Sequence, residues 1–453
     1  MIERMVLLGA SGDLTSRLLM PAVSQLAEAG LLPPGFTILG SANTGWSTED
    51  FRQHIAEGLE KHAAVSPSTR DAVVGMLGFQ PGDVTRPEDV ARLIGDDRPD
   101  TLVYLALPQT LFEPVLTALA AAGLHEADAV AIEKPFGTDL ASARHLNEIL
   151  RLQLPRPTIF RIDHFLSSEL VRRVLVLRFL NRIFEPVLNA VHVERVAISW
   201  LESLTLEGRA GYYDGAGALK DMVQNHLMEA MALVLMEQPA RVDADSVRGV
   251  RVEALRSVAT PSAERMRRDT VRARYSAGTI GARQVPSYVD EPGVDPGGDT
   301  ETYAALTLGV DSTRWAGVPF VLRSGKALAA DTAEIAIHFR PLPRFLRDQW
   351  PGVEPNVLRI GLVEPYVRLG TTLNGPERTA ESRHLEAQSA TPRFTPYANL
   401  ILEMLRKDPM LFIRGDEAEE AWRIVDPVMG AWSAGDVPMQ EYPAGEAPPG
   451  PAA

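Results

Sequence analysis

The chain contains no cysteine, which excludes disulfide bonds, thiolate metal sites and thiol nucleophiles. It also lacks a run of basic residues, and its net charge of −14 argues against a nucleic-acid partner. A few local cations would still suffice to hold an anionic substrate. We expect no metal ion in the functional site.

Long apolar runs are missing as well. No stretch reaches the roughly 20 residues that a membrane-spanning helix needs, and residues 1–5 lead straight into a strand without a visible signal peptide. We therefore expect a cytoplasmic protein without membrane contact. Its 453 residues, 45% of them apolar and 23% charged, suffice for two or three globular domains.

Residues 1–160 alternate between predicted strands and predicted helices or turns. The strands are short apolar segments at residues 5–8, 36–40, 101–107, 129–132 and 157–160. Alternation of this kind is typical of a parallel, doubly wound sheet. We therefore predict an α/β Rossmann dinucleotide-binding domain over residues 1–160, with its ligands at the carboxyl ends of the strands.

The first turn between strand and helix is rich in glycine and reads GASGDL at residues 9–14. Glycine lets backbone N–H groups approach a pyrophosphate, and the start of a helix favours its negative charge. The spacing differs from GxGxxG, so a tight turn without a ligand is the alternative interpretation. The position after the first strand favours a dinucleotide contact in residues 9–14.

The end of the second strand indicates which nicotinamide cofactor is used. An acidic side chain there bonds the ribose hydroxyls of NAD, whereas an arginine binds the 2′-phosphate of NADP. The chain continues Ser41-Ala42-Asn43-Thr44-Gly45-Trp46, without an arginine. Because Asn43, with Thr44 beside it, can bond a ribose hydroxyl but cannot neutralise a phosphate, the sequence favours NAD over NADP.

Two further strand ends are expected at the same crevice. The third strand ends at Pro108, and the fourth continues as Glu133-Lys134-Pro135-Phe136-Gly137. Lys134 can bond both a sugar hydroxyl and the cofactor edge, although a solvated lysine is the alternative. We count Pro108 and Lys134 among the cofactor contacts, and a cis bond before Pro135 would fix the direction of Lys134.

The segment Arg161-Ile162-Asp163-His164-Phe165 joins the last strand of the first domain to a helix. A later helix, at residues 220–236, is apolar almost all round, so its His226 is predicted to be buried. Asp163 can orient such a histidine as the base that takes a proton from a sugar hydroxyl. Alternatively, Asp163 and His164 only cap the next helix, and His226 is a structural core histidine.

Residues 161–440 are predicted to form a second, α+β domain with a large, mostly antiparallel sheet. Strand-like segments recur at residues 195–201, 247–255, 272–275, 301–310, 318–322 and 334–339. Residues 396–405 and 417–425 are predicted helices. Residues 441–453 are rich in Pro, Gly and Ala, so we expect a disordered tail there.

Seven collinear segments together resemble the glucose-6-phosphate dehydrogenase family over nearly the whole chain. They are GASGDL (9–14), EKPFG (133–137), RIDHFL (161–166), LRFLNRIFEPVLN (177–189), GRAGYYDGAGALKDMVQNHL (208–227), WAGVPFVLRSGKAL (315–328) and FIRGDEAEEAWRIVDP (412–427). The resemblance implies a Rossmann domain joined to a β+α domain, usually as a homodimer or homotetramer. It also implies oxidation of a cyclic aldohexose at C1 to a lactone, with hydride passing to a nicotinamide.

The resemblance also implies roles for single residues. His226 matches the family's general base, Asp163 matches the carboxylate that pairs with it, and Lys134 matches the lysine that touches sugar and cofactor. Further contacts on the sugar side are implied for Glu202, Asp221 and Lys326. The resemblance also implies that Gly9, Ser11, Gly12 and Asp13 contact the pyrophosphate.

The departures from the family pattern fall where the family binds phosphate. Its motif DHYLGKE reads DHFLSSE at residues 163–169 here, so Ser168 replaces the phosphate-binding lysine. Leu18 and Asp331 stand where the family has cations, and Asn43 stands where it has the arginine for the 2′-phosphate. His164 alone remains of the usual phosphate contacts. We therefore expect an NAD-dependent dehydrogenase of an unphosphorylated hexose, with glucose the simplest candidate and an amino sugar facing Asp331 as another.

Three other interpretations remain. An ordinary glucose-6-phosphate dehydrogenase would need relocated cations such as Arg172, Arg173 or Arg323. A non-catalytic sugar or nucleotide sensor would not need the proton acceptor that the chain retains. An oxidoreductase of the glucose–fructose type also has a Rossmann domain and an EKP turn, but the segment at residues 208–227 argues against it.

Overall fold

The structure, a computed structural model, describes residues 1–96, 98–165, 170–208, 210–376 and 379–450. Its internal contacts divide the chain into two compact units. Unit 1 comprises Met1–Glu169, Ala240–Arg248 and Pro392–Glu419, and unit 2 comprises Leu170–Pro239, Gly249–Thr391 and Glu420–Ala453. The division is discontinuous, because two later segments belong to unit 1, whereas the sequence predicts one boundary near residue 160.

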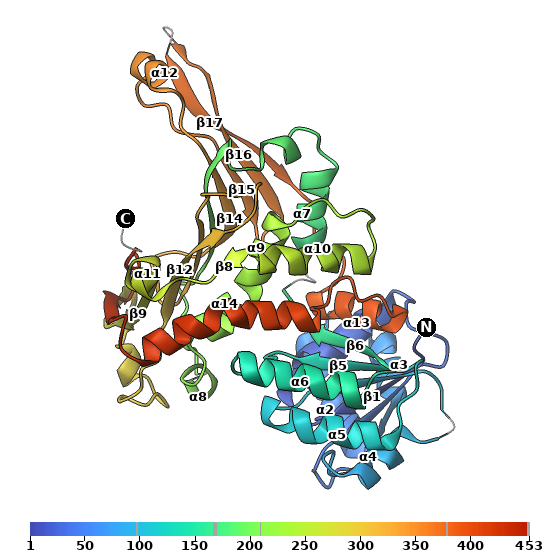
Figure 1. The fold of residues 1–453 in the computed structure, drawn as a ribbon. Helices are drawn as coiled ribbons and strands as arrows, with labels where there is room; N and C mark the ends of the chain where they lie inside the picture. Colours follow the sequence, from blue (N-terminus) through green and yellow to red (C-terminus); the bar gives the residue numbers. More distant parts are fainter. Residues whose placement is uncertain (97, 166–169, 209, 377–378, 451–453) are drawn as a thin grey trace. The chain divides into compact units, whose positions relative to one another are not determined.

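Unit 1 is built around a six-stranded parallel sheet in the order β3-β2-β1-β4-β5-β6 (Figure 1). Its strands are β1 (Arg4–Leu8), β2 (Thr37–Ser41), β3 (Leu77–Phe79), β4 (Thr101–Leu105), β5 (Ala129–Glu133) and β6 (Thr158–Ile162). The strand order reverses between β1 and β4, which is where doubly wound sheets bind dinucleotides. The predicted Rossmann fold is confirmed.

Helices cover both faces of this sheet. Met5 lies in one buried cluster, with residues of α1, α2, α3 and α13, whereas its neighbour Val6 lies in another, with residues of α4, α5 and α6. Burial on both faces is typical of parallel strands. The helical segments of this unit are η1 (Thr15–Leu19, π-helical), α1 (Met20–Glu28), α2 (Thr48–His62), α3 (Pro67–Gly75), α4 (Pro87–Ile94), η2 (Gln109–Leu111, 3₁₀), α5 (Phe112–Ala122), α6 (Leu140–Gln153) and α13 (Pro396–Arg406).

Unit 2 contains a ten-stranded sheet along the path β17-β16-β15-β14-β7-β13-β12-β9-β18, with β8 pairing beside β12. Its strands are β7 (Val193–Leu201), β8 (Val258–Ala259), β9 (Thr270–Ser276), β12 (Tyr303–Val310), β13 (Phe320–Gly325), β14 (Thr332–Phe339), β15 (Val357–Gly361), β16 (Tyr366–Asn374), β17 (Ala380–Gln388) and β18 (Met439–Pro443). Most neighbouring strands are antiparallel, while β7–β13 and β9–β18 are parallel. The predicted large, mostly antiparallel sheet is confirmed.

Short elements complete the second unit. They are α7 (Leu170–Phe179), η3 (Glu185–Val187), α8 (Ala210–Tyr213), η4 (Leu219–Leu227, π-helical), α9 (Met228–Leu235), α11 (Ala263–Asp269), the hairpin β10–β11 (Gly278–Ile280 and Arg283–Val285), η5 (Tyr288–Asp290) and α12 (Arg344–Gln349). Two helices, α10 (Ala244–Arg256) and α14 (Gly415–Ser433), begin in unit 1 and continue into unit 2. No helix of the described chain is long and apolar enough to cross a membrane.

The strand predicted at residues 247–255 is wrong, because this segment lies within α10. Val247, Arg251 and Leu255 are all fully buried, and their spacing of four places them on one helix face. Arg251 Nη2 donates to Glu229 Oε2 at 2.7 Å, which satisfies the charge in the core. The valines favoured a strand locally, and the arginine in the buried row hid the helical period.

The disordered tail predicted for residues 441–453 is also wrong in part. Met439–Pro443 forms β18, which pairs in parallel with β9. Tyr442 is buried, and its hydroxyl donates to Lys326 O at 2.7 Å. Composition alone indicated disorder, whereas one buried ring and one sheet edge are enough to order the strand. Residues 451–453 lie outside the described part.

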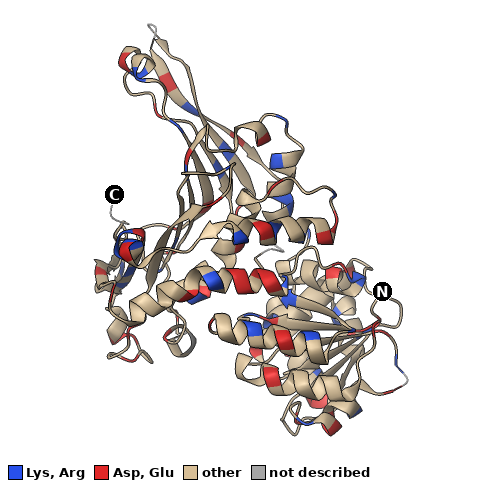
Figure 2. Ribbon diagram, in the orientation of Figure 1, with Lys and Arg blue, Asp and Glu red and all other residues tan. Residues whose placement is uncertain are grey.

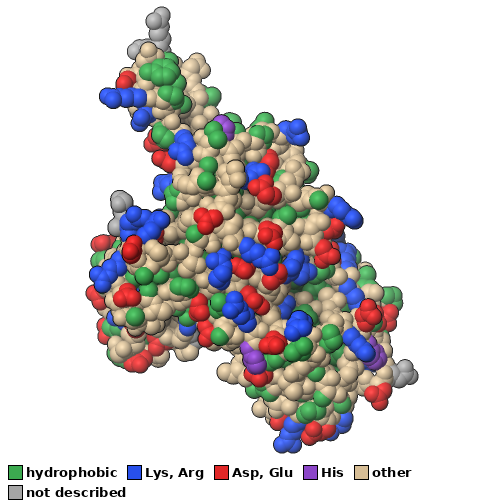
Figure 3. Space-filling model, viewed as in Figure 1, with side chains coloured by type: hydrophobic (Ala, Val, Ile, Leu, Met, Phe, Trp, Pro, Cys, Tyr) green, Lys and Arg blue, Asp and Glu red, His purple; other side chains and the backbone are tan. Residues whose placement is uncertain are grey.

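Charged side chains of both signs occur along the helices and strands of both units (Figure 2). On the face drawn in Figure 3, Lys and Arg are interspersed with Asp and Glu. This distribution accords with the absence of a basic run in the sequence.

Candidate active site

The turn between β1 and η1 forms a cradle that requires glycine. Gly9 has φ +89°, and a Cβ atom there would lie 2.2 Å from Ala106 O. Gly9 N and Ala10 N both donate to Ser41 O, which ties the turn to the end of β2. The Asp13 carboxylate accepts from Arg17 on the surface, at 3.0 Å. The backbone of this turn, rather than the charge of Asp13, therefore suits a pyrophosphate.

Three hydroxyl groups near this turn are buried without a hydrogen-bond partner in the described chain. They are Thr15 Oγ1, Ser41 Oγ and Thr44 Oγ1. Buried polar groups are normally paired, so these atoms mark places where a polar ligand can bond. Asn43 is exposed beside them. Together with the glycine cradle, these neutral groups fit a nicotinamide dinucleotide.

The ends of β4 and β5 provide the next groups. Pro108 caps η2 after β4, and β5 ends at Glu133, followed by Lys134 and a cis bond before Pro135, as predicted. Tyr104 of β4 donates to Glu133 Oε1 at 2.5 Å. Burial raises the pKa of Glu133 to about 7, against the opposing effects of its hydrogen bonds and Lys134.

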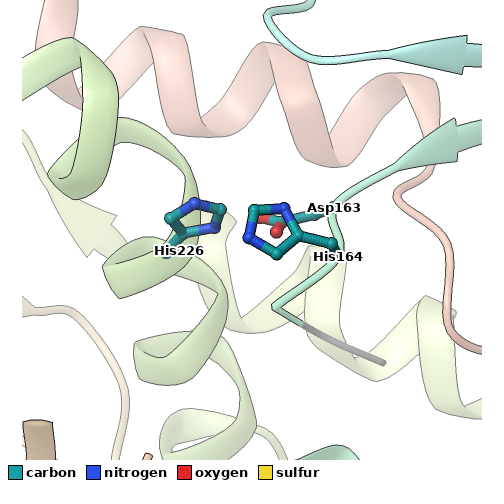
Figure 4. Close-up of side chains that lie close together, drawn as sticks. All are labelled: Asp163, His164 and His226. Carbon is teal, nitrogen blue, oxygen red and sulfur yellow. The ribbon is translucent and has the colours of Figure 1, made fainter. Parts of the chain in front are cut away.

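At the end of β6, Asp163 is fully buried, and its Oδ1 accepts from Phe165 N at 2.9 Å. His164 is half-buried, and its ring stacks on Tyr397 of α13 with 5.9 Å between centroids and 9° between planes. Figure 4 shows Asp163 and His164 on the segment that follows β6. Ser168, the other substrate residue predicted in this segment, lies outside the described residues.

In unit 2, the segment η4 carries Asp221 and His226. This segment is π-helical. The π-helix is rare in proteins, but where it occurs it is often at a functional site. His226 is 3% exposed, so its predicted burial is confirmed. Its backbone N–H donates to Asn225 Oδ1 at 2.6 Å, and Figure 4 shows its imidazole projecting from η4.

The structure pairs two of the predicted sugar contacts with each other. Lys326 Nζ donates to Glu202 Oε2 at 2.6 Å, and Trp200 Nε1 donates to Glu202 Oε1 at 3.1 Å. Lys326 Nζ also lies 5.5 Å from the centre of the Tyr213 ring. β7 and β13 are parallel neighbours, so their carboxyl ends bring Glu202 and Lys326 together. The pair can present both a donor and an acceptor to sugar hydroxyls.

Asp331 lies at the same edge of the sheet. Its Oδ1 accepts from Ser203 N at 2.6 Å, and this bond holds the pKa of Asp331 below its usual value. Two of the cations considered as relocated phosphate ligands have partners within unit 2. Arg173 is buried and donates to Gly361 O, while Arg323 donates to Ser199 Oγ at 3.0 Å.

Sequence reasoning missed the group formed by Tyr104, Glu133 and Tyr397. The Glu133 carboxylate was visible beside Lys134, but Tyr104, which donates to it, comes from β4, and Tyr397 comes from α13. No local spacing connects Tyr397 with residues 133–164. The available signal was a tyrosine in the first turn of a helix whose Ala398, Leu400 and Ile401 are buried.

A doubly wound unit with a glycine cradle, joined to a unit with paired polar side chains at strand ends, defines a nicotinamide-dependent oxidoreductase. The model of "Glucose-6-phosphate dehydrogenase, NAD binding domain" matches residues 6–173, and that of the "C-terminal domain" of the same enzyme matches residues 175–453. The chain belongs to the glucose-6-phosphate dehydrogenase family, whose members oxidise a CH–OH group of a sugar. The predicted resemblance is confirmed, and the nucleotide-binding domain indicates use of NAD(P).

Similar proteins agree with this assignment over more than nine-tenths of their length. Glucose-6-phosphate 1-dehydrogenase of Treponema pallidum is 38% identical, over 97% of this chain and 91% of its own. The enzyme of the same name from Zymomonas mobilis is 34% identical, over 98% and 95%. A solved glucose-6-phosphate dehydrogenase in complex with glucose 6-phosphate superposes with a TM-score of 0.88 at 30% identity, covering 98% of this chain and 95% of that one. The enzyme from Mycobacterium avium gives 0.86 at 32%, covering 98% and 94%.

Proposed function

We propose that the protein oxidises an unphosphorylated aldohexose, glucose being the first candidate, at C1 to its lactone, and that it uses NAD in preference to NADP. The observation that carries this proposal is Asp331. A carboxylate whose position is set by Ser203 N–H, and whose pKa is lowered, stands where the family pattern has a cation. An ionised Asp331 repels a sugar phosphate and tolerates a neutral sugar.

Two positions in unit 1 support the same choice. Leu18, where the family pattern has a lysine, is 45% exposed. Asn43, where the pattern has the arginine for the 2′-phosphate, is exposed and neutral. Each charge-assisted bond contributes roughly 1.5–3 kcal/mol, so losing the two at positions 18 and 331 weakens binding of a phosphorylated sugar by at least about a hundredfold.

The reaction assigned to the chain's own residues is a proton transfer coupled to hydride loss. His226 takes the proton of the C1 hydroxyl, and Asp163 orients and charge-stabilises the imidazole. The bond from Phe165 N fixes the Asp163 carboxylate for this task. Glu202 and Lys326 hold sugar hydroxyls, as do Asp221 and Lys134. The bound nicotinamide supplies the hydride acceptor.

The second candidate function is that of an ordinary glucose 6-phosphate 1-dehydrogenase. Two observations favour it: the names of the similar proteins, and His164, which the family uses at the phosphate and this chain retains. A sensor that binds sugar or nucleotide without turnover is the candidate from another class. For any of these functions we propose a cytoplasmic protein that forms a homodimer or homotetramer. Light scattering of the purified chain would measure the oligomeric state.

Initial rates with glucose and glucose 6-phosphate, each with NAD and NADP, test the proposal. We expect the highest kcat/KM for glucose with NAD, because the phosphate of glucose 6-phosphate has lost its cations at positions 18 and 331 and an ionised Asp331 repels it. If glucose 6-phosphate with NADP is preferred, the second candidate is correct and the phosphate ligands lie elsewhere. If no pair reacts while NAD still binds, the sensor gains support.

A further inference from the structure

Glu301 in unit 2 is a buried carboxyl group that the proposed reaction does not use. It is 7% exposed and lies two residues before strand β12. The residue between them, Thr302, is fixed to the sheet on both sides. Its N–H donates to Ala273 O at 2.9 Å, and its carbonyl oxygen accepts from Lys326 N at 3.0 Å. The backbone that carries the Glu301 side chain is therefore held in place by the sheet.

The element that Glu301 contacts is the start of η4. Its Oε1 accepts from the N–H of Leu219, the first residue of η4, at 2.8 Å, and its backbone oxygen accepts from Ala218 N at 3.3 Å. The first N–H groups of a helix have no partner within the helix. Ala218 has no side chain that could cap η4, and both residues are buried from solvent. Glu301 thus takes the place of a helix cap.

Gly217 makes room for the Glu301 carboxylate. It has φ +68°, a conformation that favours glycine, and a Cβ atom there would lie 2.4 Å from Glu301 Oε1. No side chain at position 217 is compatible with the present place of the carboxylate. The chain before η4 is therefore shaped around a carboxyl group that comes from 82 residues further along the sequence.

The segment that Glu301 holds carries two residues of the candidate site. Asp221 follows Leu219 by two positions and His226 follows it by seven, and Figure 4 shows the His226 ring projecting from η4. η4 is π-helical over nine residues, whereas π-helices mostly occur as single turns. It also contacts β12, the strand that follows Glu301. Fixing the start of η4 against this strand sets where the His226 ring lies.

We infer that Glu301 is a positioning residue, which fixes the start of η4 and thereby places the His226 imidazole for proton removal. Glu301 acts through η4 and not on the sugar or the cofactor. A misplacement of about 1 Å can reduce a rate about a hundredfold, so loss of this contact should act on kcat. The role of His226 rests on the proposed function, whereas the contact between Glu301 and η4 does not.

The test compares Glu301→Leu with Glu301→Gln, using whichever sugar and cofactor the wild-type enzyme prefers. The glutamine side chain keeps an oxygen that can accept from Leu219 N, whereas the leucine side chain has a similar size and no acceptor. We expect Glu301→Leu to lower kcat about ten- to hundredfold, and Glu301→Gln to stay within about twofold of wild type. Hydrogen exchange of residues 219–227, followed by mass spectrometry, should be faster in Glu301→Leu only.

Two controls separate positioning from a general loss of folded enzyme. Tyr275→Phe removes a hydroxyl that donates to Glu291 at 2.9 Å elsewhere in unit 2, and it should leave kcat unchanged. In a His226→Asn background, Glu301→Leu should lower kcat no further, because both changes act on one group. An equal loss of kcat in both backgrounds, or a wild-type kcat in Glu301→Leu, overturns the inference.

The exchange measurement needs no substrate, which separates this inference from the proposed function. If the wild-type enzyme prefers glucose 6-phosphate, the proposed substrate is wrong, while the expected loss of kcat in Glu301→Leu still tests Glu301. If residues 219–227 exchange equally fast in wild type and both variants, the inference is wrong whatever the substrate is. If the wild type has no turnover, the proposed reaction and the role of Glu301 toward His226 are both refuted.

Discussion

The two units position their candidate site residues in different ways. In unit 1, Gly9, Asn43, Lys134 and Asp163 all follow neighbouring parallel strands, so one rule of the doubly wound sheet places them. In unit 2, Glu202 and Lys326 meet only because β7 and β13, far apart in sequence, pair in parallel. The predicted cofactor contacts therefore follow from local sequence, whereas the predicted sugar contacts Glu202 and Lys326 depend on long-range pairing.

Each unit also holds one buried carboxyl group that resists ionisation. Burial raises the pKa of Glu133 in unit 1 and of Glu301 in unit 2 to about 7. The Tyr104 phenol donates to Glu133 at 2.5 Å, while Leu219 N, at the start of η4, donates to Glu301 at 2.8 Å. Side chains thus position the carboxyl in one unit, and the backbone positions it in the other.

The largest expected effect comes from removing the proposed general base in unit 2 while leaving the proposed cofactor site of unit 1 intact. His226→Asn should lower kcat by about 10²- to 10⁴-fold, because a general base contributes that much. Calorimetric NAD affinity should stay at the wild-type value. A kcat within threefold of wild type would remove His226 from the proposed role. Asp163→Asn serves as the matched variant and should reduce kcat less.

Stability should depend on pH through both buried carboxyls. A glutamate whose pKa rises from 4.5 to about 7 on folding binds a proton more tightly in the folded state, so the free energy of unfolding falls as pH rises between these values. For Glu133 the loss amounts to about 3 kcal/mol. Glu133→Gln should therefore gain stability relative to wild type between pH 5 and pH 8, measured by urea unfolding.

Glu301→Gln is the matched variant for unit 2 and should show a change of the same sign, since burial raises its pKa to the same value. If wild type and both variants keep parallel stabilities across pH 5 to 8, the two carboxyls ionise normally. A change in only one variant would show that the units differ in how they hold a buried acid.

The next effect concerns the charge at the sheet edge of unit 2. Asp331→Arg should lower the KM for glucose 6-phosphate at least about tenfold, because it replaces a repulsive charge with a charge-assisted donor. Asp331→Asn removes only the repulsion and should have a smaller effect. An unchanged KM in the arginine variant would place the phosphate away from residue 331.

The smallest effect is expected at the ribose end in unit 1. Asn43→Arg should tighten NADPH binding, followed by its fluorescence, by about tenfold while leaving the affinity for NADH near its wild-type value. Thr44→Ser provides a control that adds no charge. Equal tightening of both cofactors would indicate a nonspecific charge effect.

The sequence carried enough to predict five of the six strands of the unit 1 sheet, because each is a short apolar run, but it missed β3, which has only three residues. The burial of His226 was also predictable, since the helix that holds it is apolar almost all round. It misled at α10, where buried Arg251 interrupts the apolar period, and at β18, where one buried tyrosine outweighs the composition. Tyr397 was unpredictable because only tertiary packing brings α13 to the end of the sheet.

An internal competition measures the central claim most directly. Wild-type enzyme receives equal concentrations of glucose and glucose 6-phosphate with limiting NAD, and mass spectrometry quantifies the two acids formed after lactone hydrolysis. The product ratio equals the ratio of the two kcat/KM values. The account predicts mostly the unphosphorylated acid, because an ionised Asp331 repels the phosphate. A mixture dominated by the phosphorylated acid would contradict the assignment of Asp331 and its companion positions.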